Sequence, residues 1–330
     1  MKKQILENEN SAEQLKIVAI GGGHGLSALL RGIKKYSNQI TAVVTVADNG
    51  GSSGALRRDM GVLPPGDIRS CLCALSPDEE LLGQVLQYRF STSSGVGGHN
   101  LGNLLLTALT SITGSFEQGI QELARILAIR GRVLPSTLQD VNLEAEVEFE
   151  ESGTKEVQTI FGESEISDRG GKVRKMWIIP EDVMANPEAQ HDILAADLIV
   201  LGPGSLYTSI LPNLKVKGIS QAIKASKAPI FYICNLTSQP GETDGFNCSE
   251  HVEIMKEAID GKEIDGIICN NYQELNLPKN VTWVKINSEF CIEYNVYQDN
   301  LVDINHPTRH DSDKLAKLLM NSYSAFTSTK

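Results

Sequence analysis

The stretch that most constrains this chain is Leu15 to Ala28, with the sequence LKIVAIGGGHGLSA. Residues 17–20 form a short apolar run rich in β-branched side chains, which is typical of a buried strand. Glycines then end the strand, and apolar residues at helical spacing predict a helix from Leu26 to Tyr36. In such a turn, backbone N–H groups can approach a ligand closely, and the helix N-terminus favours negative charge. The sequence therefore predicts an anion site, most simply for a phosphate, at the amides of Gly22, Gly23 and Gly25.

The same glycines fit a more specific pattern. Gly23, Gly25 and Ala28 match the G-x-G-x-x-[GA] signature of dinucleotide-binding turns, and Asp48 ends the next apolar run, where a ribose-binding acid is expected. An NAD-binding oxidoreductase is thus one hypothesis, although no separate set of hydride-transfer residues is visible. The alternative without a ligand is a tight turn whose glycines serve only close packing.

The composition of the chain limits the kinds of ligand that such a site can bind. The formal net charge of the 330-residue chain is −11, so no global basic field holds nucleic acid, and we expect none as a partner. Local donors must therefore hold an anionic ligand, which favours a small, enclosed molecule. No apolar run approaches the roughly 20 residues of a membrane span, and the N-terminal lysines precede no apolar signal core. The six cysteines lack paired metal-binding spacing and are predicted to be reduced, mostly buried thiols of a cytoplasmic protein.

Four further apolar runs indicate a mainly parallel sheet, and hence an α/β fold. They are residues 40–47, 197–201, 230–235 and 266–270, nearly continuous segments of the kind buried on both faces. Small polar residues follow each run, and such loops share one edge of a parallel sheet, so we expect them to build one cleft. The predicted nucleotide- or phosphate-binding residues in these loops are Asp48, Asn49, Ser52, Ser53, Arg57, Gly202, Gly204, Ser205, Asn235, Thr237, Thr243 and Tyr272.

Other polar groups could complete this cleft. A rigid Pro-Pro-Gly turn at 64–66 presents Asp67, whose simpler role would be to cap the following helix. His99 could act as an acid, a base or a phosphate donor, or merely form hydrogen bonds at a helix start together with Asn100 and Asn103. Within the polar cluster at 305–311, the predicted ligand contact is Arg309, and the predicted anion-binding loop also includes His24.

The middle of the chain departs from this pattern. Polar and apolar residues alternate at 141–149, a turn follows at 151–154, and strands are expected at 155–161 and 173–179. These segments predict an antiparallel β-hairpin inserted near residues 139–180, whose outward-facing acids suit a flank or subunit interface better than a catalytic centre. Residues 131–137 are predicted to form a turn. We expect a polar tail at 1–14 and a single domain at 15–330.

Several motifs occur together in one order: GGGHGLS, TVADNGGSSGALRR, LPPGDIRSCL, GHNLGNLLL, LGPGSLYTSI, PNL and NLTSQPGETDG. Through them the chain resembles the CofD-like superfamily from Leu15 to about Asn271, and within it the YvcK-type gluconeogenesis factors of bacteria. The resemblance implies a Rossmann-like three-layer core and a homodimer. Two positions depart from the family pattern, in which threonine is usual at His24 and a second aspartate is usual at Asn49.

The resemblance also implies two functions. YvcK-type members are associated with binding of UDP-sugars such as UDP-N-acetylglucosamine and with control of cell shape and envelope on gluconeogenic carbon sources. That implies a cytoplasmic regulator that requires neither catalysis nor a cofactor. The related 2-phospho-L-lactate transferases move a phospholactyl group from a guanosine diphosphate carrier onto a deazaflavin with magnesium. In that alternative Asp48 would hold Mg²⁺ beside the diphosphate, but Asn49 would bring no negative charge to the cation.

Overall fold

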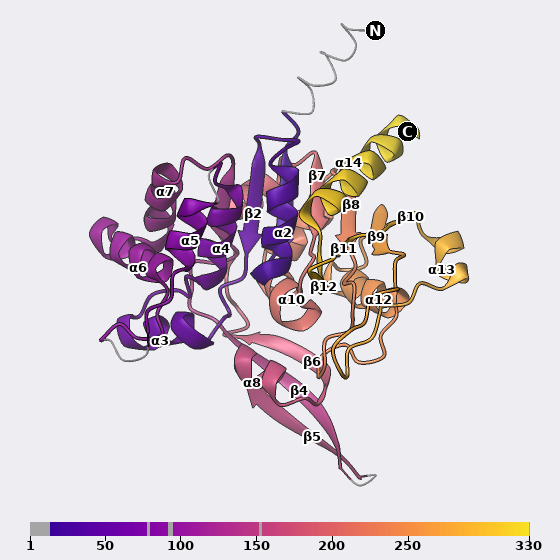
Figure 1. Ribbon diagram of the computed structural model, residues 1–330, viewed down its shortest axis with the longest axis horizontal. Helices are drawn as coiled ribbons and strands as arrows, with labels where there is room; N and C mark the ends of the chain where they lie inside the picture. The colour runs from indigo at the N-terminus through magenta and orange to yellow at the C-terminus, as the bar shows by residue number, and fades with distance from the viewer. Residues whose placement is uncertain (1–13, 78–79, 92–94, 152–153, 330) are drawn as a thin grey trace, which may run out of the picture.

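A seven-stranded parallel sheet forms the centre of the computed structural model, which describes residues 14–77, 80–91, 95–151 and 154–329 (Figure 1). The strand order is β10-β9-β8-β7-β1-β2-β3. Strand β1 lies inside the sheet and pairs with β2 on one side and with β7 on the other. The bounds are β1 (Ile17–Gly21), β2 (Ile40–Val44), β3 (Arg132–Pro135), β7 (Leu198–Leu201), β8 (Ile230–Ile233), β9 (Gly266–Asn270) and β10 (Val296–Asp299). The predicted α/β class and mainly parallel sheet are confirmed.

Helices cover both faces of this sheet and complete three layers. Alternate strand residues face opposite cores, because successive side chains of a strand point to opposite faces. One face packs against α2 (Gly23–Ile33), α4 (Gly66–Leu75), α5 (Leu81–Gln87), α6 (Leu101–Thr113), α7 (Phe116–Ile126) and α14 (Ser312–Thr329). The other packs against α9 (Pro187–Leu194), a π-helical turn at Leu206–Ile210, α10 (Leu211–Lys215), α11 (Ile219–Ala225) and α12 (Cys248–Ala258). Two further helices are α3 (Gly51–Met60) and α13 (Ser288–Glu293).

Helix α2 begins inside the glycine run, earlier than the sequence pattern predicts. Gly22 is its extended N-cap, and the first three helical residues, Gly23 to Gly25, give no apolar signal. The helix also ends earlier, at Ile33. The ammonium group of Lys34 then donates hydrogen bonds to the carbonyls of Ala74 (2.8 Å) and Ser76 (2.7 Å), at the end of α4. The lysine at the end of α2 thus satisfies carbonyls of a neighbouring helix.

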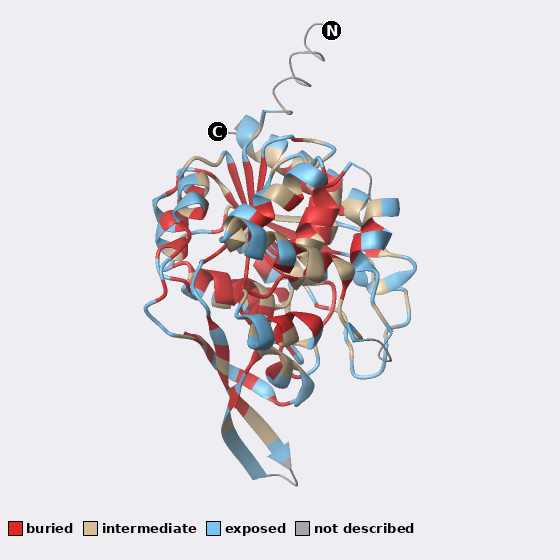
Figure 2. Cartoon of the chain, turned by 90° about the vertical axis from the view of Figure 1, so that its left-hand side faces the viewer, coloured by how far each residue is buried: buried red, intermediate tan, exposed pale blue. Residues whose placement is uncertain are grey.

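The insertion is larger than the predicted hairpin. It is a three-stranded antiparallel sheet in the order β5-β4-β6, formed by β4 (Asn142–Glu151), β5 (Thr154–Phe161) and β6 (Lys172–Ile179), with α8 (Glu163–Asp168) between β5 and β6. It projects from the end of the main sheet at which β1 and β2 finish (Figure 1). Figure 2 shows that the part next to the body is buried and the far end exposed. The turn tip at 152–153 and residues 1–13 of the predicted tail lie outside the described residues.

Three short strands were not predicted from the sequence, namely β3, β10 and the strand at His306–His310. Residues 132–135 form β3 rather than part of a turn, and they pair with β2 at the edge of the sheet. Its four residues include a proline, so the segment carries a weak strand signal. The polar strand β10 forms the opposite edge. A hairpin of β11 (Val302–Asp303) and β12 (His306–His310) leads into α14. Among the described helices, none combines the length and the apolar character that a bilayer crossing requires.

Candidate functional site

The topology itself locates a cleft. After β1 the chain adds β2 and β3 on one side of the sheet, and later adds β7 to β10 on the other. The point where the order reverses, between β1 and β7, is where open α/β sheets bind ligands beyond the carboxyl ends of their strands. A cavity of about 960 Å³ lies there. Loops after β1, β2, β7 and β8 line it, together with α8 and the β11–β12 hairpin.

Most of the predicted site residues come together around this point. The cavity is lined by Gly22, Gly23, His24, Gly25, Asp48, Asp67, Gly204, Ser205, Asn235, Thr237 and Arg309. A smaller adjoining hollow of about 190 Å³ is lined by Ser52, Ser53, Asn100 and Asn103. Gly23, His24, Asp48 and Asp67 line both spaces. The two spaces therefore share a polar wall.

Three glycines of the first loop each have a steric role. A Cβ at Gly22 would lie 2.7 Å from a carboxylate oxygen of Asp67, and one at Gly25 would lie 2.5 Å from the carbonyl oxygen of Pro203. Gly23 has a φ of +61°, which other residues adopt only with strain. Close packing therefore accounts for two of these glycines, and backbone conformation for the third. The packing interpretation of this loop is thus supported, and the ligand-binding interpretation stays a prediction.

Asp67 binds the N-terminus of α2 from within the protein. Its Oδ2 accepts a hydrogen bond of 2.7 Å from the backbone N–H of Gly23. Burial and the charge of Asp48 raise the pKa of Asp67 from 3.8 to about 6, although the Gly23 hydrogen bond and Arg69 act in the opposite direction. The first amide of α2 is thus occupied by a carboxylate. A diphosphate would have to bind other donors of this loop or displace Asp67.

A group of acids forms one side of the cleft. Glu163, at the start of α8, has a pKa raised from 4.5 to about 8 by burial and by the charges of Asp48 and Asp67. Burial also raises the pKa of Glu242, against the hydrogen bonds that it accepts from Ser205 and Ser167. These acids repel one another, so the cleft favours protonation or a bound cation on this side.

Positive charge gathers around His24. Burial lowers the pKa of His24, and the charges of Arg309, Arg31 and Arg69 lower it further. The imidazole is therefore neutral at pH 7 and available as a hydrogen-bonding group. Arg31 comes from α2 and Arg309 from β12, so a phosphate here would meet two guanidinium groups from different elements.

Some hydrogen-bond donors and acceptors beside the smaller hollow have no partner within the described part of the chain. Among the described residues, Nε and one terminal nitrogen of Arg69 and Oδ1 of Asn103 are buried without a hydrogen-bond partner. The hollow is also lined by the first or capping residues of α2, α3, α4 and α6. Four helix N-termini and an arginine with unused N–H groups favour an anionic group.

Six predicted residues do not line either space. Arg57 instead donates a hydrogen bond of 2.6 Å to the carbonyl of Val141 and pairs with Asp140 at 2.6 Å, which anchors the insertion. Asn49 accepts a hydrogen bond of 3.1 Å from the N–H of Ser164. His99 contacts Ser52 through Nδ1 at 3.1 Å. The hydroxyl of Thr243 accepts a hydrogen bond from the N–H of Gln239. Gly202 forms a cis peptide bond with Pro203. Tyr272 packs against the hydrophobic core.

Sequence reasoning missed part of the lining. Glu163 and Ser167 come from the insertion, which was expected to form a flank or an interface, and Arg31 sits on a helix expected only to pack. Their contribution depends on contacts between segments far apart in the chain. Only the acidic character of residues 163–168 could have drawn attention to α8.

The acids offer oxygen ligands of the kind that Mg²⁺ prefers. Among the described residues, however, no three carboxylates lie close enough together to form a ready cation site; the one such group of possible metal ligands consists of cysteines. Asp48 and Glu163 could hold Mg²⁺ only together with water and phosphate oxygens, which is how this ion is usually bound.

The fold and cleft define a Rossmann-like α/β protein with a polar cavity at the topological switch point. Comparison with known families assigns it further: the chain belongs to the family described as 2-phospho-L-lactate transferase CofD, whose model matches residues 17–325. The resemblance found from the motifs is thereby confirmed.

Relatives and a solved structure agree with this assignment. The chain is 48% identical over 254 residues to the gluconeogenesis factor of Halalkalibacterium halodurans, covering 77% of each chain. It is 40% identical over 316 residues to the gluconeogenesis factor of Bacillus subtilis, covering 93% of this chain and 97% of that one. A crystal structure of a Bacillus halodurans protein superposes with a TM-score of 0.83 at 39% identity, over 93% of this chain and 99% of the other.

Proposed function

We propose that this protein is a cytoplasmic regulator that binds a nucleotide sugar of the UDP-sugar type. The observation that carries the proposal is the cavity of about 960 Å³ at the switch point, with Arg31 and Arg309 in its lining and their charges acting on His24. Such a volume is in the range of small-molecule sites. The relatives named gluconeogenesis factor support a role in carbon metabolism. We propose that this role includes control of cell shape and envelope on gluconeogenic carbon sources.

The charge distribution suggests an orientation for the ligand. The diphosphate lies near His24, where Arg31 and Arg309 supply charge-assisted hydrogen bonds. The base or the sugar lies toward Asn235 and Thr237, whose polar side chains suit uncharged carbonyl and hydroxyl groups. We propose that the protein acts as a homodimer.

A second candidate is phospholactyl transfer from a guanosine diphosphate carrier to a deazaflavin. The matching family model and the acids beside the cleft favour it, because Asp48 and Glu163 could hold Mg²⁺ against a diphosphate. In that case Mg²⁺ would neutralise charge on the phosphates. Asp67, beside the N-terminus of α2, would position the loop that faces them.

Calorimetry tests both candidates. UDP-N-acetylglucosamine, guanosine diphosphate and NAD are titrated separately into the protein, with and without Mg²⁺. We expect binding of the UDP-sugar and a loss of about tenfold or more in Arg309→Gln, because a hydrogen bond to a charged group contributes about 1.5–3 kcal/mol. The matched control is Arg125→Gln on α7, an exposed arginine paired with Glu122, which should bind normally.

Two results would reject the proposal. One is the absence of UDP-sugar binding at concentrations well above those in cells. The other is phospholactyl transfer when the protein is incubated with the guanosine donor, the deazaflavin and Mg²⁺. A preference for NAD, lost in Asp48→Ala, would instead support the oxidoreductase hypothesis.

A further inference from the structure

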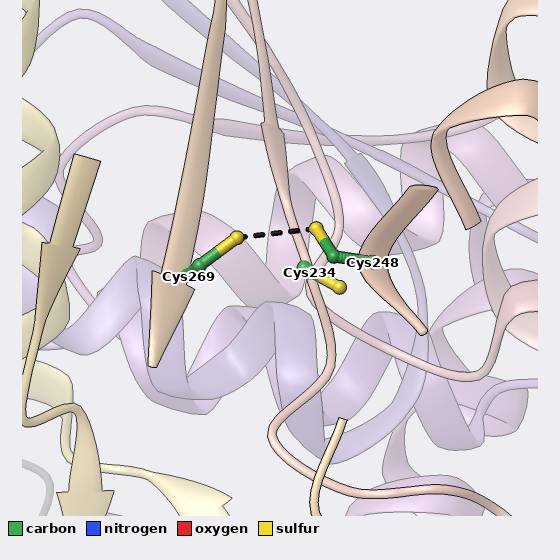
Figure 3. A group of neighbouring side chains, drawn as sticks. All are labelled: Cys234, Cys248 and Cys269. Carbon is green, nitrogen blue, oxygen red and sulfur yellow. Dashed lines mark hydrogen bonds between the residues drawn. The ribbon is translucent and has the colours of Figure 1, made fainter. Parts of the chain in front are cut away.

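Three cysteines far apart in the sequence meet in the core behind the cleft. Cys234 directly follows β8, Cys248 is the first residue of α12, and Cys269 lies on β9. Their sulfur atoms all lie within 4.8 Å of one another, and the sulfurs of Cys248 and Cys269 are 3.2 Å apart (Figure 3). All three residues are buried, with at most 1% of their surface exposed. The spacing of cysteines in the sequence gave no sign of this group.

We propose that Cys234, Cys248 and Cys269 bind one Zn²⁺ ion through their three thiolates. Zn–S bonds of about 2.3 Å at tetrahedral angles place two sulfur ligands about 3.8 Å apart. The sulfurs here are gathered at that scale, so small side-chain rotations would complete the geometry. Thiolates are soft ligands that select zinc over magnesium or calcium, and a buried group is typical of a structural zinc site.

The start of α12 favours the charge that metal binding needs. Cys248 occupies the first turn of an 11-residue helix, where the helix dipole stabilises a thiolate. The thiol of Cys248 therefore lies where ionisation is favoured. Binding of Zn²⁺ would release the remaining thiol protons to solvent.

Two other buried polar groups point to a missing partner. Among the described residues, Nε2 of His251 and the hydroxyl of Tyr232 are buried without a hydrogen-bond partner. Tyr232 belongs to the same buried core cluster as the three cysteines. Such unpaired groups are uncommon in protein cores and often mark an ion or water site.

His251 could complete the ligand set. It lies one helical turn after Cys248, and its Nδ1 is 2.9 Å from the carbonyl oxygen of Asn247. Donation from Nδ1 leaves Nε2 as the nitrogen with a free lone pair, which is the usual arrangement of a zinc-binding histidine. Its ring would have to turn toward the ion, because Nε2 is not in the group of mutually close ligand atoms.

A disulfide explains the group less well. Its sulfur atoms would have to close from 3.2 Å to about 2.0 Å and lose two electrons to an oxidant, and Cys234 would remain without a role. A zinc ion uses all three thiols. It would also tie β9 to both ends of the segment between Cys234 and Cys248, which contributes Asn235, Thr237 and Glu242 to the cleft.

Metal analysis tests the proposal. The full chain is expressed in medium supplemented with zinc, so that a buried site can fill during folding, and is purified with a reductant and without chelators. We expect about one zinc per chain in the wild type, and the same in the controls Cys71→Ala, which removes a buried thiol elsewhere, and Cys291→Ser, which removes the exposed one. Cys248→Ala should contain almost none.

Expression with cobalt gives a second measurement that needs no variant. Three thiolate ligands should produce a strong sulfur-to-cobalt charge-transfer absorption in the wild-type protein. The proposal would be wrong if wild-type protein carried no zinc and no such absorption, or if Cys248→Ala kept its zinc. A Cys248–Cys269 disulfide in freshly isolated protein, detected by mass spectrometry, would equally overturn it.

Discussion

Glu163 allows a direct test of the acidic side of the cleft. Its pKa rises from 4.5 to about 8, through burial and the charges of Asp48 and Asp67. At pH values between about 4.5 and 8, the carboxyl group of Glu163 is protonated in the folded protein and ionised in the unfolded chain. The stability associated with that proton is therefore fully present below about pH 4.5 and is lost as the pH rises to about 8. Replacing Glu163 with glutamine removes the ionisable group and nearly preserves the shape of the side chain.

The size of the stability change linked to the Glu163 proton follows from the two pKa values. Their difference, 8 − 4.5, is about 3.5, and at about 1.4 kcal/mol per pKa unit this sets an upper limit of about 5 kcal/mol above pH 8. Glu163 is partly exposed, and water screens its interaction with Asp48 and Asp67. We therefore expect Glu163→Gln to gain about 1–3 kcal/mol of unfolding free energy, relative to the wild type, between about pH 5 and pH 9.

Urea titrations over that pH range measure the effect, with the fluorescence of Trp177 and Trp283 as the signal. The matched control is Glu165→Gln, two residues along the same helix, where an exposed glutamate pairs with Arg169 at 3.5 Å. This control should follow the wild type at every pH. The reasoning would be refuted if the difference in unfolding free energy between Glu163→Gln and the wild type did not change with pH. It would also be refuted if Glu165→Gln showed the same pH-dependent difference from the wild type as Glu163→Gln.

Two further substitutions test the first loop. Gly25→Ala places a Cβ 2.5 Å from the carbonyl oxygen of Pro203 and should lower the unfolding free energy by about 1–3 kcal/mol, whereas Gly95→Ala, which meets no atom within 4 Å, should have little effect in the same thermal melts. His24→Thr should change the calorimetric affinity for UDP-N-acetylglucosamine less than about threefold, because a neutral imidazole adds no charge to the site. A much larger loss would show that the imidazole itself contacts the ligand.

The part of the site that could be predicted follows from local sequence and from parallel-sheet geometry. Buried strands such as β1 and β7 give continuous apolar runs, and the loops after their carboxyl ends must share one edge. That is why Gly23, Asp48 and Gly204, which are distant in sequence, could be placed in one cleft. Short edge strands such as β3 lack this signal, because four residues ending in proline also match a turn.

The part that could not be predicted depends on contacts between distant segments. Arg57 was expected to face the ligand because it follows a glycine-rich loop. Its guanidinium instead bonds to Val141, 84 residues later, and no local pattern contains that information. The opposite error occurred at α8, for which no role in the cleft was predicted although Glu163 lines the cavity. The three cysteines escaped notice for the same reason, because they come from a strand end, a helix start and a neighbouring strand.

The insertion packs against the loop after β2, and Asn49 has a structural role in this contact. Its Oδ1 accepts the N–H of Ser164 at the start of α8, and a Cβ at Gly162 would lie only 2.1 Å from its Nδ2, so the fit is tight. An aspartate could accept the same hydrogen bond. It would, however, add a charge beside Asp48 and Glu163, which already repel each other. With an amide at this position, α8 can pack against the cleft with less need for a cation, which is the physical reason to favour ligand binding over magnesium-dependent transfer.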